Sequence, residues 1–341
     1  MYTVDFERKG PGLFLRDMRA GKAQDARRAA AVIAHVNPDV LVLAGIDYDH
    51  GLATLGVFAD ELSRAGVDYP HHFAQRPNTG MPTGLDVNGD GYFGDAVDAQ
   101  GYGRYSGEKG LAILSRYPFL RDEARDFSEY LWRDLPDANL PEVDGNPYYS
   151  DEVLAVLRLS TTAHWDVPIE TGNGPLHLLT YYATPPVFDG PEDRNGKRNA
   201  DETRFWTKYL NGELSEQPAN APFALIGNAN LDPHDGDGKG AAIAELLAHP
   251  SLQDPKPASV GGVEAANASH SGDPALDTAA WPENDKLPGN LRVEHVLPSR
   301  DLKVLDAGVF WPETGTEEVS LIAEGEGITR HRLVWVDIEM P

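Results

Sequence analysis

A short run of consecutive apolar residues, Val40-Leu41-Val42-Leu43, most constrains what this chain can fold into. A strand that is apolar on both faces has to be covered on both faces, which is typical of a sheet inside an α/β protein. The preceding segment, residues 23–36, has apolar residues at helical spacing. It ends at Asn37-Pro38, because the residue before a proline avoids the helical region. A helix that leads into a buried strand therefore predicts an α/β fold.

Similar patterns recur along the chain and predict the remaining elements. Strands are expected over residues 111–114, 153–159, 176–182, 223–226, 293–297 and 332–337, and helices over residues 52–65, 201–210 and 240–249. Thr171-Gly172-Asn173-Gly174 is typical of a hairpin turn between two strands. Segments 78–107 and 256–290 are rich in Gly, Pro and Asp and predict long loops, which are usually functional. Together these elements indicate two sheets packed face to face and covered by helices, in one domain over residues 1–341.

The charge balance limits the partners that this chain can bind. Lys and Arg total 29 and Asp and Glu total 54, so the net charge is −25. Binding to nucleic acid needs cationic groups that displace counterions from the phosphates, so we expect no non-specific binding of DNA or RNA. No apolar run approaches the roughly 20 residues needed to cross a bilayer, so we expect no membrane span.

Cysteine usage and the first residues bear on the compartment. The sequence has no cysteine, which excludes disulfides, thiolate nucleophiles and thiolate metal sites. Such a composition fits an exported bacterial protein as well as a cytosolic one. The residues from Met1 to Asp5 lack the basic start and apolar core of a signal peptide. We nevertheless expect a secreted or periplasmic location, since a strongly acidic surface suits a salty or calcium-containing medium.

Six segments, in this order along the chain, resemble the endonuclease/exonuclease/phosphatase superfamily. They are Pro38-Asp39-Val40-Leu41-Val42-Leu43 with Ala44-Gly45-Ile46-Asp47, then Gly110 to Pro118, the strand ending at Tyr182, Ile226-Gly227-Asn228-Ala229-Asn230-Leu231-Asp232-Pro233, Leu291 to Ser299, and Arg330-His331-Arg332-Leu333-Val334. The resemblance implies a four-layer α/β/β/α sandwich with the active site at one end of the two sheets. It also implies a divalent cation, usually Mg²⁺ or Mn²⁺, that polarises a phosphoryl oxygen while a His or Asp activates water.

This sequence departs from the family's pattern at most of the positions that hold the metal. By the resemblance, the early Asn falls on Thr3, the metal-binding Glu on Gly45, and the His of the third segment on Tyr182. The Asp of the fourth segment is replaced by Asn228, although its partner Asn230 is kept.

The last two segments change in the same way. The Asp of the fifth is Glu294, and the Asp before the final His is Arg330, while His331 itself remains. Mg²⁺ usually requires one or two carboxylates, and the Asp that becomes Arg330 would orient the His. We therefore expect His331 to lack its carboxylate partner and to be a poor base.

Two interpretations follow from these departures. In the first, which we favour, the chain is a catalytically impaired member, a pseudoenzyme that binds a small anionic ligand. In the second, it is a metal-dependent phosphatase or phosphodiesterase with a rearranged site. Asp47, Asp232, Asn230 and Glu294 would then hold the metal, with His331 as base and Arg330 as a phosphate clamp. A third hypothesis is a structural domain stabilised by calcium.

Asp86-Val87-Asn88-Gly89-Asp90-Gly91-Tyr92 matches the first half of a calcium-binding loop. The side chains of Asp86, Asn88 and Asp90 and the carbonyl of Tyr92 would supply oxygens, and Asp95 and Asp98 could complete the shell. A structural Ca²⁺ would explain how so long a loop stays ordered. The alternative is a solvated turn rich in Asp and Gly.

A basic cluster in an otherwise acidic chain follows the strand that ends at Tyr182. Arg194 and Arg198 are predicted to bind an anionic group near the mouth of the site. The alternative is that these arginines form salt bridges with neighbouring acidic residues.

Overall fold

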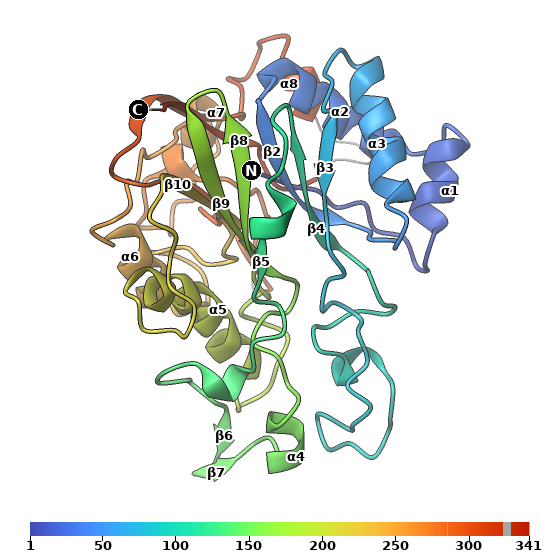
Figure 1. Cartoon of the computed structure of the whole chain (residues 1–341), viewed down its shortest axis with the longest axis vertical. Coiled ribbons are helices and arrows are strands. Elements are labelled where there is room, and N and C mark those ends of the chain that lie inside the picture. Colours follow the sequence, from blue (N-terminus) through green and yellow to red (C-terminus); the bar gives the residue numbers. More distant parts are fainter. Residues whose placement is uncertain (285, 323–328, 341) are drawn as a thin grey trace.

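The computed structural model describes residues 1–284, 286–322 and 329–340, and its centre is a pair of facing sheets (Figure 1). The first sheet has the order β1-β2-β4-β3, with β1 at Tyr2–Thr3, β2 at Val40–Ile46, β4 at Gly110–Ser115 and β3 at His71–Phe73. The second has the order β13-β10-β9-β8-β5, with β13 at Glu294–Pro298, β10 at Phe223–Asn228, β9 at Gly174–Tyr182, β8 at His164–Thr171 and β5 at Arg125–Asp126. Val42 and Ile113 of the first sheet share one core with Trp165, Leu178 and Ile226 of the second.

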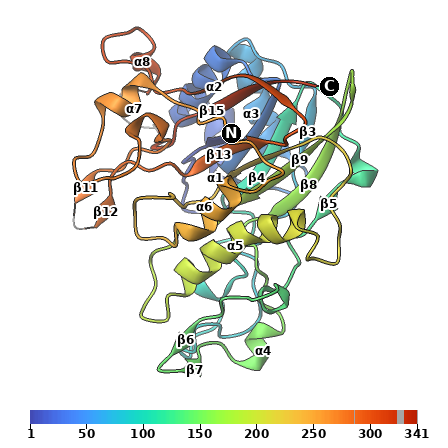
Figure 2. The same ribbon diagram turned by 90° about the vertical axis from the view of Figure 1, so that its left-hand side faces the viewer.

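Helices cover the outer face of each sheet (Figures 1 and 2). On the first sheet lie α1 (Leu13–Arg19), α2 (Gln24–Val36) and α3 (Ala53–Arg64), and on the second lie α5 (Arg194–Leu210) and α6 (Ala241–Leu247). Each layer of helices has its own apolar core, built around Phe14, Ile33 and Phe58 on one side and around Phe205 and Trp206 on the other. The predicted four-layer α/β/β/α sandwich is therefore confirmed.

The remaining elements are short and mostly lie outside the two sheets. They are the helices α4 (Asp151–Leu154), α7 (Val260–Glu264) and α8 (Val319–Ile322), the 3₁₀ turns Ala96–Asp98, Arg121–Glu123, Trp132–Asp134 and Pro274–Leu276, and the strand pairs β6 (Glu142–Val143) with β7 (Asn146–Pro147), β11 (Glu283–Asn284) with β12 (Leu287–Pro288), and β14 (Lys303–Val309) with β15 (Val334–Glu339). Among the described residues, no helix has the length and hydropathy to cross a membrane. The assignment of residues 1–341 to one domain stays a prediction.

Most of the predicted elements are found, and one is wrong. The predicted hairpin turn joins β8 to β9, with Thr171 paired to Gly174. The predicted strand over residues 153–159 does not form, because Ser150 caps α4 by accepting a hydrogen bond from Val153 N. The predicted loop 256–290 contains α7 and the short β11–β12 pair.

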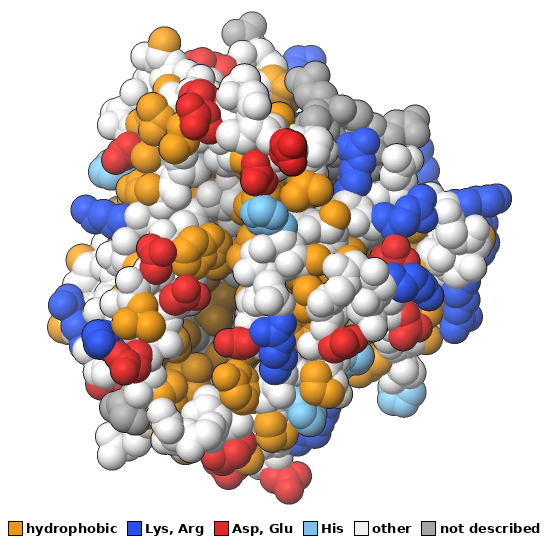
Figure 3. Space-filling model, turned by 90° about the horizontal axis from the view of Figure 1, so that it is seen from above, with side chains coloured by type: hydrophobic (Ala, Val, Ile, Leu, Met, Phe, Trp, Pro, Cys, Tyr) orange, Lys and Arg blue, Asp and Glu red, His pale blue; other side chains and the backbone are white. Residues whose placement is uncertain are grey.

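Two long connections project at the end of the sandwich where β9 and β10 finish (Figure 1). We call residues 78–109 the first arm and residues 127–163 the second arm. At the opposite end, an apolar hollow of about 730 Å³ opens between the sheets, lined by Val40, Leu176, Ile226 and Val336 among others. Figure 3 looks down on that end and shows hydrophobic side chains around the hollow. The two arms and the apolar hollow therefore lie at opposite ends of the sandwich.

Candidate functional site

Strand pairing places three of the predicted site residues in one row. Asn228, the last residue of β10, is paired with Tyr182 at the end of β9 on one side. On the other side it is paired with Glu294 at the start of β13. Since β9 and β10 are parallel and β13 is antiparallel, these three residues lie side by side at one end of the strands of the second sheet.

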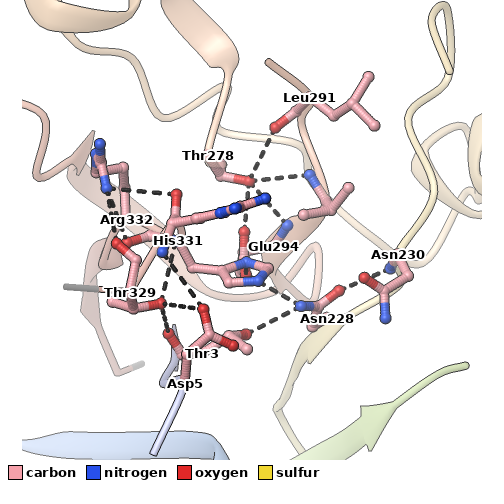
Figure 4. A network of polar contacts seen from close by, with 12 residues as sticks. Thr3, Asp5, Asn228, Asn230, Thr278, Leu291, Glu294, Thr329, His331 and Arg332 are labelled. Atoms are coloured by element: carbon pink, nitrogen blue, oxygen red, sulfur yellow. Dashed lines mark hydrogen bonds and ion pairs between the residues drawn. The ribbon is translucent and has the colours of Figure 1, made fainter. Parts of the chain in front are cut away.

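Glu294 and His331 form a buried ion pair at this end of the second sheet (Figure 4). Nδ1 of His331 lies 2.5 Å from Oε1 of Glu294, which is only 1 % exposed. Glu294 Oε1 also accepts a hydrogen bond from Asn228 Nδ2 at 3.1 Å, and Oε2 accepts one from Thr278 Oγ1 at 2.6 Å. The expectation that His331 lacks a carboxylate partner is wrong, because Glu294 supplies the carboxylate that the Arg at position 330 does not.

The charge of Glu294 decides the protonation of His331. Burial alone would lower the pKa of this imidazole, but the Glu294 carboxylate, with a smaller effect from Asp5, raises the pKa above its ordinary value. Trp281 packs edge-on against the ring, with centroids 5.3 Å apart. His331 is therefore a carboxylate-paired histidine in a mostly dry environment, which is the arrangement of a general base or of a cationic anchor.

Asp5 is a site residue that the sequence reasoning missed. Asn228 Nδ2 donates to Thr3 Oγ1 at 3.0 Å, so Thr3, on which the family's early Asn falls by the resemblance, lies in the network. The Asp5 carboxylate, two residues on, accepts a hydrogen bond from Thr329 Oγ1 at 3.3 Å, and it acts electrostatically on both Tyr182 and His331. Burial, together with Asp5 and Glu294, raises the pKa of Tyr182, so its phenol stays neutral. A two-residue β1 gives too little pattern for the sequence to reveal Asp5.

Gly45 has a backbone conformation that excludes a side chain. Its φ is +89°, in the left-handed region, and it lies at a bulge where the pairing of β2 with β4 shifts register. A Cβ built on Gly45 would lie 2.1 Å from the carbonyl oxygen of Val4. By the resemblance, the family's metal-binding Glu falls on this position, and this backbone leaves no room for it.

The other candidate metal ligands make hydrogen bonds within the protein. Asp47 accepts from the hydroxyl of Tyr105 at 2.8 Å and from Lys109 N at 3.2 Å. Asp232 accepts from the backbone N–H groups of His234, Asp235 and Arg292. Asn230 donates its side-chain amide to the carbonyl of Ala183 at 2.7 Å. Over residues 1–284, 286–322 and 329–340, no three His, Asp or Glu side chains form a group suited to hold a metal ion. The residues present do not fit the metal site implied by the resemblance.

Arg330 is exposed and next to the network without belonging to it. Its backbone N–H points to Asp5 Oδ2 at 3.4 Å and its carbonyl accepts from Ala280 N. Its guanidinium has no hydrogen bond or ion pair with a described residue. Its role as a phosphate clamp stays a prediction.

The two arginines predicted to bind an anion differ in their surroundings. Arg194 forms an ion pair with the buried Glu192. Arg198 is buried and donates to three backbone carbonyls, those of Gln100 in the first arm and of Arg158 and Leu159 in the second. The structure thus gives Arg198 a clear structural task, and anion binding by either arginine stays a prediction.

The predicted calcium loop lies in the first arm and is organised by hydrogen bonds between side chains and the backbone. Asp86 accepts from the N–H groups of Gly89, Asp90 and Gly91, while Asp90 accepts from Tyr92 N. The buried Asp98 accepts from Val87 N and Gly94 N, and Asp95 accepts from Val97 N. Asn88 donates to Asp90. These bonds account for an ordered loop, and Ca²⁺ binding stays a prediction.

Comparisons with known proteins agree with this architecture. The family model described as "Endonuclease/Exonuclease/phosphatase family" matches residues 18–322. An endonuclease/exonuclease/phosphatase from Beutenbergia cavernae superposes with a TM-score of 0.54 and 16 % identity over 92 % of this chain, which spans 66 % of that protein's length. A mannosyl-6-phosphatase from Bacteroides thetaiotaomicron superposes with a TM-score of 0.50 and 12 % identity, over 99 % of this chain and 98 % of that one.

At these identities the superpositions support the fold alone. The search of curated proteins found no match. The family model matches most of the sequence and includes five of the six segments, while the sixth, at residues 330–334, lies beyond the matched residues. The chain belongs to the endonuclease/exonuclease/phosphatase family.

Proposed function

We propose that this chain is a catalytically impaired member of its family, with a degraded metal site, and that it acts by binding a small anionic ligand. The acidic surface, with a net charge of −25, argues against nucleic acid as that ligand. A secreted or periplasmic location suits the same charge.

The conformation of Gly45 is the observation that carries this proposal. A lost carboxylate could be restored by one substitution if the backbone still had room for it. Here the left-handed φ and the approach of the Val4 carbonyl remove that room. A divalent cation with hard-oxygen preference would find neither the Glu at this position nor an Asp at position 228, where Asn228 donates its amide to Glu294.

Glu294 supports the same conclusion from the other side of the site. Its two oxygens accept hydrogen bonds from Asn228 and Thr278 and form an ion pair with His331, which leaves little capacity to coordinate a metal ion. Its charge is instead compensated by the imidazolium of His331. The site keeps a histidine that can carry a positive charge, which is a useful partner for an anion.

The Glu294–His331 ion pair also favours a second candidate, a metal-dependent phosphatase or phosphodiesterase that hydrolyses a small phosphoester in a rearranged site. In this alternative His331 would take a proton from water, Glu294 would stabilise the resulting imidazolium, and Asn230 would orient the phosphoryl group. The retained pair is the feature that favours this alternative.

Hydrolysis of 4-nitrophenyl phosphate and bis(4-nitrophenyl) phosphate, with Mg²⁺ or Mn²⁺, separates the two candidates. We expect the same residual rate in the natural chain and in the His331→Ala variant, because neither holds a competent metal. The Arg64→Ala variant, in an exposed ion pair on α3, controls for contaminating phosphatases. A metal-dependent rate that His331→Ala abolishes and Arg64→Ala retains would establish the hydrolase instead.

A further inference from the structure

A cavity of about 580 Å³ lies between the two arms and the segment that follows β9, and it adjoins the candidate site at Tyr182. Tyr182 belongs to both places, since it is paired with Asn228 in the sheet and also lines the cavity. The hydroxyl of Tyr182 has no hydrogen-bond partner among the described residues, so its donor is available to a ligand.

The charge of this cavity is opposite to that of the whole chain. Three cationic side chains line it, those of Lys109, Arg194 and Arg198, and none of its described lining residues is an Asp or a Glu. Arg194 is paired with Glu192 and Arg198 with backbone carbonyls, while the Lys109 ammonium forms no ion pair with a described residue. In a protein of net charge −25, a wall whose charged side chains are all positive is complementary to an anion.

The mouth of the cavity carries exposed aromatic rings. Phe188 is 83 % exposed and Tyr102 is 67 % exposed, and both line the cavity. Phe188 has a φ of +71° and Lys109 a φ of +48°, so two of the nine non-glycine residues that the structure describes in the left-handed region lie here. The segment around Phe188 is fixed by Asn195, which donates its side-chain amide to Val187 O at 2.7 Å and its N–H to Asp189. An exposed ring held in an unfavourable backbone conformation indicates a function for that ring.

We infer that this cavity binds a small organic anion with an aromatic ring, its anionic group on Lys109 and Tyr182 and its ring against Phe188 and Tyr102. This inference rests on the proposed function, which it deepens by naming the ligand class and the place where it binds. Ring stacking and burial favour an aromatic ligand over a bare anion, and the charged donor favours an anion over a neutral ring.

Titration calorimetry with phenylphosphonate, inorganic phosphate and benzyl alcohol tests this inference. The carbon–phosphorus bond of phenylphosphonate is not a phosphoester, so binding is measured even if the chain proves to be a hydrolase and the proposed function fails. We expect phenylphosphonate to bind about tenfold more tightly than phosphate, and benzyl alcohol to bind more weakly than either.

Variants locate the binding. Phe188→Ala and Lys109→Met should each weaken phenylphosphonate about tenfold, and Lys109→Met should also remove most of the salt dependence. Phe93→Ala is the matched control, since Phe93 is 73 % exposed in the first arm but does not line the cavity. Phenylphosphonate that does not bind, that binds no better than phosphate, or that binds equally to Phe188→Ala would overturn the inference.

Discussion

Replacement of Gly45 by Ala isolates the backbone constraint that distinguishes this site. Ala adds only a Cβ, which would lie 2.1 Å from the Val4 carbonyl oxygen, far inside van der Waals contact. The left-handed φ of +89° costs an Ala about 1–2 kcal/mol. Relief of the clash requires a shift of β1 or β2 within a packed core, which typically costs a further 1–3 kcal/mol or so. We therefore expect Gly45→Ala to lower the free energy of unfolding by about 3 kcal/mol.

Gly66 provides the matched control for this substitution. It has a similar φ, +99°, but a Cβ built on it meets nothing within 4 Å. Gly66→Ala should therefore lower the free energy of unfolding only by the cost of the left-handed φ, about 1–2 kcal/mol. Urea denaturation of both variants gives the difference in unfolding free energy. Equal losses in the two variants would refute the claim that the Val4 carbonyl excludes a side chain at position 45.

Three further predictions concern titrating groups and the calcium loop. Burial raises the pKa of Glu202 to about 7, against the smaller effects of Arg198 and of hydrogen bonds from Thr161 and Thr184. Because the folded state binds the extra proton, stability should fall as the pH rises from about 4.5 to 7, by on the order of 3 kcal/mol, and denaturation of Glu202→Gln should not show this slope. Glu294→Gln should lower the pKa of His331, measured by NMR titration. In the natural chain the pair contributes stability that is complete below about pH 6.5 and is lost as the pH rises through the raised pKa. An unchanged His331 titration would contradict the assignment of Glu294 as its partner. If the loop at 86–98 holds Ca²⁺, a chelator should lower the melting temperature of the natural chain but not of Asp86→Ala, and equal melting with and without chelator would exclude a stabilising ion.

The sequence predicted the buried strands well because their apolar runs are local patterns. β2, β4, β9 and β10 each lie where the pattern of apolar residues predicted a strand, at residues 40–43, 111–114, 176–182 and 223–226. The predicted strand at 153–159 fails because Ser150 caps a helical turn there, so a local side-chain bond prevails over the apolar pattern.

The site was harder to predict because its contacts join residues far apart in the chain. Glu294 and His331 are brought together by the arrangement of β13 and the segment before β15, which no local spacing encodes. Asp5 follows a strand of only two residues, and the steric demand at Gly45 comes from the carbonyl of Val4, which directly follows the neighbouring strand β1. The resemblance points to a glycine at the position of a metal ligand, but the sequence does not show why no other residue fits there.

The Arg198 guanidinium fixes how the two arms lie beside the cavity that is proposed to bind a ligand. It holds the carbonyl of Gln100 together with those of Arg158 and Leu159, so the two arms are fastened to each other and to α5. These hydrogen bonds form when the protein folds, before any ligand binds. A ligand of the cavity should then bind with little loss of chain entropy, because the arms are already held in place before it binds.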